Sequence, residues 1–120
     1  MTSKVDATLN MHEGGRKVDV RGPISKWDSD EDYALFTVVI SQVHDDGTVT
    51  NAMGSSVRYA HGATYWEATA MVTDPGRHLR PGAAKAYGVA TIATAGDPEA
   101  YPWPNDVELI PAVVAAGTRG

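Results

Sequence analysis

Apolar and polar residues alternate with a period of two along much of the chain. The clearest stretch is 64–95, where alternating runs at 64–72 and 83–95 flank a corner rich in Pro and Gly. A period of two places successive side chains on opposite faces of a β-strand, and Pro and Gly mark the turn between strands. The stretch therefore predicts two consecutive strands, with Trp66, Ala68, Ala70 and Val72 sharing one face of the first, and Ala84, Ala86, Gly88, Ala90 and Ile92 sharing one face of the second.

Similar patterns predict the other strands. Alternation is strict at 5–11 and returns at 17–21, after which Gly22-Pro23 is expected to interrupt the strand. The segment 33–43 is apolar on both faces, which predicts a central strand whose second face is covered by a partner or a loop. A hairpin turn at Asp46-Gly47 leads into a returning strand at 48–59. The last strand is expected around 107–109, after a stiff loop at 96–105 that contains three prolines.

About seven short strands with frequent turns predict an all-β fold, a single antiparallel β-sandwich domain over 1–120 with a tail at 112–120. A jelly roll or a small β-barrel fits the same pattern. The run Leu79-Arg80-Pro81-Gly82 resembles the turn before the penultimate strand of fibronectin type III and related immunoglobulin-like domains. The resemblance implies an immunoglobulin-like sandwich with a corner tyrosine three residues after the glycine. Lys85 stands there, and Tyr87 follows two residues later.

Composition narrows the classes of partner. The chain has 120 residues, a net charge of −5 and no cysteine. Its acidic balance disfavours binding to nucleic acid and to anionic lipid, and the lack of cysteine excludes disulfides and thiolate metal sites. The first ten residues contain no apolar core of a signal peptide, so we expect a cytoplasmic protein or one incorporated into a virion.

Two acidic clusters are candidate metal sites. Asp28, Asp30 and Asp32 have the spacing with which a calcium loop begins, but the glycine and the glutamate that complete an EF-hand are missing. A Ca²⁺ site of oxygen ligands at the end of the fold is one interpretation, and a solvated loop without any cofactor is the other. His44, Asp45 and Asp46 form the second cluster, suited to a metal or a general base.

Three aromatic residues are candidates for ligand or protein binding. Trp27, Tyr101 and Trp103 lie in segments predicted to be loops, and Pro102 and Pro104 would hold two of these rings with little entropy to lose. Exposed rings of this kind stack on sugars or anchor protein interfaces. The alternative is that they fold back over the core as lids.

These features favour a non-enzymatic structural or interaction module. The chain has no cysteine nucleophile and no Gly-x-Ser-x-Gly motif. An immunoglobulin-like domain without an export signal suggests a virion decoration or tail-type assembly protein, which would self-assemble or bind a protein partner. The alternatives are a carbohydrate- or ligand-binding module and a small metal-dependent enzyme that uses histidine and aspartate at one end of the fold.

Overall fold

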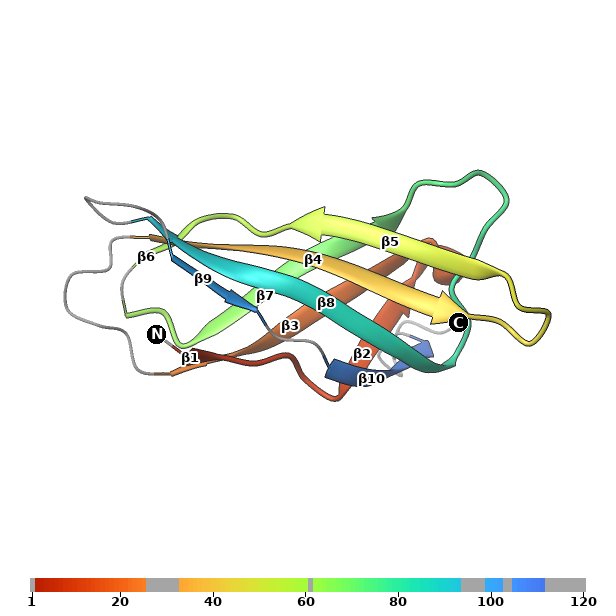
Figure 1. Cartoon of the computed structure of the whole chain (residues 1–120), viewed down its shortest axis with the longest axis horizontal. Coiled ribbons are helices and arrows are strands. Elements are labelled where there is room, and N and C mark those ends of the chain that lie inside the picture. Colours follow the sequence, from red (N-terminus) through yellow and green to blue (C-terminus); the bar gives the residue numbers. More distant parts are fainter. Residues whose placement is uncertain (1, 26–32, 61, 94–98, 103–104, 112–120) are drawn as a thin grey trace, which may run out of the picture.

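The computed structural model describes residues 2–25, 33–60, 62–93, 99–102 and 105–111. This part of the chain is built mainly of strands (Figure 1). The elements in chain order are β1 (Thr2–Ser3), β2 (Thr8–His12), the 3-10 helix η1 (Glu13–Gly15), β3 (Lys17–Ser25), β4 (Tyr33–Val43), β5 (Val49–Ser55), β6 (Tyr59–Ala60), β7 (Tyr65–Val72), β8 (Gly82–Ala93), β9 (Glu99–Pro102) and β10 (Asn105–Pro111). Within the described ranges, no helix is long and apolar enough to span a membrane.

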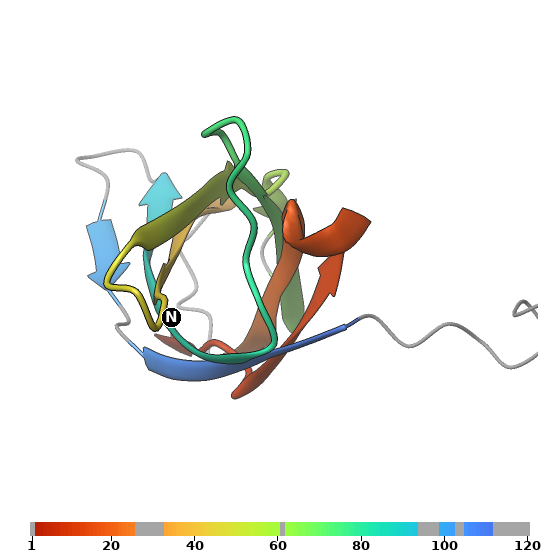
Figure 2. The ribbon, with the colours of Figure 1, turned by 90° about the vertical axis from the view of Figure 1, so that its right-hand side faces the viewer.

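Seven strands close into one barrel. Their order around the ring is β4-β5-β7-β3-β2-β10-β8, and the pairing of β8 with β4 completes the circle. All neighbours are antiparallel except β2 and β10, which run parallel, so the sheet is mixed. Viewed along the barrel axis, the strands form a ring (Figure 2). The short strands β1, β6 and β9 pair with β3, β4 and β8 respectively.

The predicted immunoglobulin-like sandwich is therefore wrong, and the small β-barrel given as an alternative is correct. A sandwich has two separate sheets, whereas here the nine-residue ladder between β4 and β8 joins the sheet to itself. The resemblance of 79–82 to a fibronectin-type corner fails as well. Tyr87, the nearest tyrosine, is 45% exposed on the outside of β8, where it cannot serve as a corner.

Inward-facing residues fill the barrel as the alternation predicts. β4 and β7 alternate strictly between outward and buried positions over most of their length. Large residues on some strands face small ones on others, which lets side chains interdigitate in a narrow barrel. The buried apolar set comprises Val5, Leu9, Met11, Val18, Val20, Ile24, Ala34, Phe36, Val38, Ile40, Ala52, Trp66, Ala68, Ala70, Val72, Leu79, Ala84, Ala86, Val107 and Leu109.

The two ends of the barrel are closed differently. At the start of β4 and β7, Trp66 stacks on Phe36 and its indole N–H donates to the carbonyl of Lys4 at 2.9 Å. At the opposite end, the connection between β7 and β8 runs across the opening (Figure 2) and inserts Leu79, which is buried. The second end therefore has a polypeptide cap, and the cavity described below lies beside it.

Two local predictions also need correction. β3 continues through Gly22-Pro23 instead of stopping there. The proline is tolerated because this side of its backbone faces the segment that follows β1, where the Pro23 carbonyl accepts from Lys4 N at 3.2 Å. The stiff loop predicted at 96–105 contains β9, whose register with β8 is the same as that of β10.

Candidate functional site

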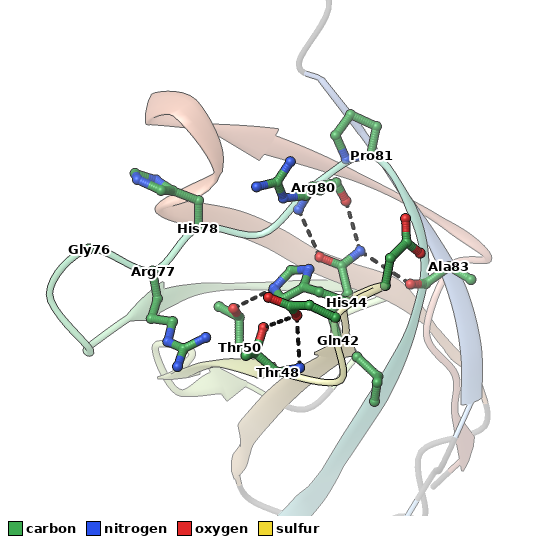
Figure 3. Close-up of a pocket in the computed structure, with 13 residues that line it drawn as sticks. Gln42, His44, Thr48, Thr50, Gly76, Arg77, His78, Arg80, Pro81 and Ala83 are labelled. Atoms are coloured by element: carbon green, nitrogen blue, oxygen red, sulfur yellow. Dashed lines mark hydrogen bonds between the residues drawn. The ribbon is translucent and has the colours of Figure 1, made fainter.

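A cavity of about 650 Å³ lies between the β4–β5 hairpin and the β7–β8 connection (Figure 3). Its walls are mainly polar, and they come from segments about thirty residues apart in the sequence. The lining residues are Gln42, Val43, His44, Asp45, Asp46, Thr48, Thr50, Gly76, Arg77, His78, Arg80, Pro81 and Ala83. A cavity of this size accommodates a small ligand, and the mouth of a β-barrel is a common place for one.

The hairpin side of the cavity is a tight turn from His44 to Thr48. Gly47 N donates to the His44 carbonyl at 2.9 Å, and Gly47 has a φ of +86°, which a residue with a side chain rarely adopts. The Asp46 carboxylate accepts hydrogen bonds from the hydroxyl and the amide of Thr48 at 2.6 and 2.9 Å. These two bonds, with smaller contributions from the charges of His44 and Arg77, hold the pKa of Asp46 below its ordinary value.

The loop side begins with a turn at 74–77, in which Pro75 and Gly76 take the positions that a type II turn favours. Arg16 anchors this turn, since one guanidinium nitrogen donates to the carbonyls of both Asp74 and Arg77 at 2.8 Å. Further along, Leu79 N donates to the Gly15 carbonyl at 2.8 Å. The loop is thus fixed at several points to η1 and to Arg16, which follows η1.

Gln42 fixes the far end of the loop to β4. Its side-chain amide donates to the carbonyls of Arg80 and Ala83 at 2.8 and 3.2 Å, and its carbonyl accepts from Arg80 N at 2.7 Å. The residue is buried, so its three hydrogen bonds are made away from water. Gln42 therefore acts as a clamp, and the cavity is formed before any ligand arrives.

The floor of the cavity contains a histidine held in place. His44 Nε2 and the Thr50 hydroxyl are 2.6 Å apart, and Thr50 is fully buried. From the loop, the Arg77 side chain extends toward the hairpin, while the ring of His78 points away from His44 (Figure 3). Among the described residues, the Arg77 guanidinium forms no hydrogen bond or ion pair. Arg77 is half-buried and all the N–H donors of its guanidinium are available, so it is the group of the cavity best suited to bind a ligand.

The positive and the negative side chains of the cavity come from different segments of the chain. The loop contributes Arg77 and Arg80, and the hairpin contributes Asp45 and Asp46. The chain as a whole has an excess of acidic residues, so this balanced set makes the cavity less negative than the average surface. The arrangement suits a ligand that is negative at one end and carries hydrogen-bond donors at the other.

The structure brings together only part of the predicted site. His44, Asp45 and Asp46 all line the cavity, as the sequence suggested for a functional cluster. Within the described ranges, no group of three His, Cys, Asp or Glu side chains is placed to hold a metal ion. The calcium candidates Asp28, Asp30 and Asp32, and the aromatic candidates Trp27 and Trp103, lie outside the described residues. Tyr101 pairs with Ala90 in β9, and its side chain is also outside the described set.

The other half of the cavity was not predicted from the sequence. Polar residues at inward-facing positions are the sequence signal that could have indicated it. Gln42 and Thr50 occupy such buried positions, on β4 and β5 respectively. A buried glutamine needs partners, which indicates that a segment of backbone must lie against it. The two arginines of 77–80 gave no comparable signal, since charged residues in a turn are ordinarily solvated.

No protein-family model, curated protein or solved structure matches the chain at a significant level. The class of the protein is therefore defined by its own fold and site. It is a small closed β-barrel with a preformed polar cavity at one mouth.

Proposed function

We propose that this protein binds a small, polar, acidic ligand in the cavity between the β4–β5 hairpin and the β7–β8 connection. The observation that carries the proposal is the Arg77 guanidinium, which faces the hairpin and forms no hydrogen bond or ion pair among the described residues. A planar guanidinium with free donors matches a carboxylate or phosphate group in two hydrogen bonds. The loop that presents Arg77 is already anchored, so little conformational entropy is lost on binding.

The hairpin determines which chemical groups the other end of the ligand should carry. Asp45 and the second oxygen of Asp46 offer acceptors, and His44 adds a ring nitrogen at the floor. Hydroxyl or ammonium groups would pair with these acceptors. The ligand class is therefore an acid that also carries donors, such as a sugar acid or an amino acid, which is a narrower form of the ligand-binding interpretation.

Binding without turnover is the better interpretation of His44 and Thr50. A histidine next to a hydroxyl is the arrangement of an activated nucleophile, but such a nucleophile must be accessible to its substrate. Thr50 has no exposed surface, so its hydroxyl positions the His44 ring instead. We therefore propose a binding protein in preference to a hydrolase.

Isothermal titration calorimetry with galacturonate and with glutamate tests the proposal, with neutral galactose as the control ligand. At least one of the two acids should bind, and galactose should bind far more weakly. Arg77→Ala should weaken binding roughly 10- to 100-fold, because a hydrogen bond to a charged group contributes about 1.5–3 kcal/mol. Arg58→Ala is the matched control, since Arg58 lies on the β5–β6 connection, at the opposite end of β5 from the hairpin. Absence of binding by both acids, or equal affinities of the Arg77→Ala variant and the unsubstituted protein, would refute the proposal.

The structural or interaction role remains a second candidate, because one wall of the barrel has the composition of an interface, as described next. Assembly into a virion, and the cytoplasmic location expected from the sequence, stay predictions.

A further inference from the structure

One wall of the barrel carries no charge. Neither β4, with 11 residues, nor β5, with 7 residues, contains a charged side chain. Seven of the large apolar residues with substantial exposure lie on this side of the molecule. They are Tyr33, Leu35 and Val43 on β4, Val49 and Met53 on β5, and, on the two flanking strands, Met71 and Tyr87. We call the outward faces of β4 and β5, together with Met71 and Tyr87, the uncharged wall.

The strand register turns part of this wall into a continuous apolar row. Met71 pairs with Met53, Met53 with Val39, and Val39 with Tyr87, so the four side chains lie on adjacent strands in one line across the barrel. Met53, Met71 and Tyr87 are each about half exposed, at 54%, 48% and 45%. Directly opposed side chains lie about 5 Å apart, so the row is one surface and not a set of scattered residues.

Most of the outward-facing charged residues of the described strands lie on the other side of the barrel. Lys85 on β8 borders the uncharged wall, since it pairs in register with Ser41 of β4, and its ammonium group contacts Asp106 of β10 at 2.6 Å. The outward positions of β2, β3, β7 and β10 include His12, Lys17, Asp19, Arg21, Glu67, Asp106 and Glu108. Several of them are paired there, as Arg21 is with Glu67 at 3.5 Å and His12 is with Asp19. In a chain of net charge −5, two copies that meet through the uncharged wall avoid most of the repulsion between them. Depletion of charge with Met and aromatic residues at the centre is also what protein interfaces show.

We propose that the uncharged wall is the interface of a symmetric dimer of this chain. Val39 lies midway between Met53 and Tyr87 in the row. A two-fold axis that runs along β4 in the plane of the interface then places Met53 of one copy against Tyr87 of the partner subunit, and the reverse contact follows by symmetry. Methionine sulfur against an aromatic ring is a favourable contact, and a flexible methionine adapts to a convex surface.

The size of the wall fits a weak dimer. A strand of 11 residues is about 35 Å long, and four neighbouring strands are about 15–20 Å wide, which gives at most about 500–700 Å² on each copy, since strands of a closed barrel curve away from the partner. Stable complexes bury about 800 Å² on each partner, so dimerisation should depend on concentration. The dimer also gives the second face of β4 the cover that its apolar sequence predicts. Val43 belongs to both the wall and the cavity lining, while the rest of the lining lies at the mouth of the barrel, outside the wall.

Sedimentation velocity at rising concentration tests the interface. The protein should shift from the mass of one 12.7 kDa chain toward twice that mass. Met53→Lys should raise the dissociation constant at least about tenfold, because it places an unpaired charge in the contact. Thr8→Lys is the matched control, since it adds the same charge at an exposed position of β2 on the charged side, and it should dimerise normally. Thermal unfolding of each variant, followed by circular dichroism, separates loss of the dimer from loss of the fold.

The double variant Met53→Lys/Tyr87→Glu tests the two-fold arrangement itself. In one chain, the two positions lie on opposite sides of Val39, about 10 Å apart, which is too far for a direct pair. In the proposed dimer they face each other, so the double variant should dimerise again where Met53→Lys alone does not. An unsubstituted protein that stays monomeric up to about 1 mM would overturn the interface and leave the wall to a different partner. A double variant that stays monomeric would overturn the two-fold arrangement.

Discussion

The rings of Phe36 and Trp66 lie almost parallel, with planes 2° apart and centroids 4.6 Å apart, inside the barrel. Tyr59 packs edge-on against Phe36, with the ring centroids 5.7 Å apart. The aromatic cluster fills the barrel at the end remote from the cavity. The molecule therefore has an apolar end that supplies stability and a polar end that can be specialised for binding.

Trp66 should be the most sensitive core position. Trp66→Ala removes the stacked ring and the hydrogen bond to the Lys4 carbonyl, and we expect a loss of about 3–5 kcal/mol in the free energy of unfolding. Trp66→Phe keeps an aromatic ring there and should lose less. Urea unfolding followed by circular dichroism measures both variants. A loss below about 1 kcal/mol for Trp66→Ala would show that the cluster does not stabilise the barrel.

Gly15 and Gly14 form a matched pair for testing the contact between η1 and the β7–β8 connection. Both have positive φ, at +90° and +66°, so alanine strains the backbone at each. A Cβ on Gly15 would lie 2.1 Å from the Leu79 carbonyl oxygen, whereas one on Gly14 would meet nothing within 4 Å. Gly15→Ala should therefore destabilise the protein by at least about 1 kcal/mol more than Gly14→Ala does. Equal thermal unfolding of the two variants would contradict the close approach.

Gln42→Leu tests the clamp on the loop. The substitution leaves the Arg80 amide and the carbonyls of Arg80 and Ala83 without their partner, at a cost of about 1–3 kcal/mol. Faster amide hydrogen exchange is expected at Arg80, and ligand affinity should fall because the loop is less ordered. Asn10→Leu is the control, since this residue is at an outward position of β2 and lies outside both the cavity and the uncharged wall. If exchange at Arg80 is the same in both variants, the clamp is not what holds the loop.

The stabilisation that the Asp46–Thr48 turn gives to the fold should decrease at low pH. Hydrogen bonds from Thr48 lower the pKa of Asp46 in the folded protein below its ordinary value of 3.8. The stabilisation is therefore fully present above pH 3.8 and is lost as the pH falls through the lower pKa of the folded state. Thr48→Val removes the hydroxyl donor and should raise the pKa of Asp46 toward 3.8. A carbon-detected NMR titration measures it, and a pKa at or above 3.8 in the unsubstituted protein would contradict the turn geometry.

The local pattern predicts the strands well and the closure of the sheet poorly. The bounds of β4 coincide with the predicted segment 33–43, because a run of β-branched residues leaves little choice of structure. Sandwich and barrel impose the same alternation, since each buries one face of every strand. What distinguishes them here are the pairings of Ile40 with Ala86 and of Leu9 with Leu109, which join distant parts of the chain. No local pattern encodes such contacts.

In the candidate site, too, the local part could be predicted from the sequence and the part that depends on long-range contacts could not. The hairpin with His44, Asp45 and Asp46 is a local feature and was found as a cluster from its sequence. Its counterpart, the loop that presents Arg77, reaches the hairpin only because the barrel closes and Leu79 inserts into its mouth. A cavity formed by two loops distant in sequence needs the topology before it can be predicted.

Chemical-shift mapping with galacturonate and with glutamate tests the proposed binding site most directly. With each acid that binds, the amides of 42–50 and 76–83 should shift, with the largest changes near Arg77, while the amides of 33–39 and 52–55, in the parts of β4 and β5 remote from the cavity, stay unchanged. The same titration of the Arg77→Ala variant should give no saturable shifts. Saturable shifts that map to another part of the barrel, or no shifts with either acid at concentrations up to about 10 mM, would contradict ligand binding at the barrel mouth.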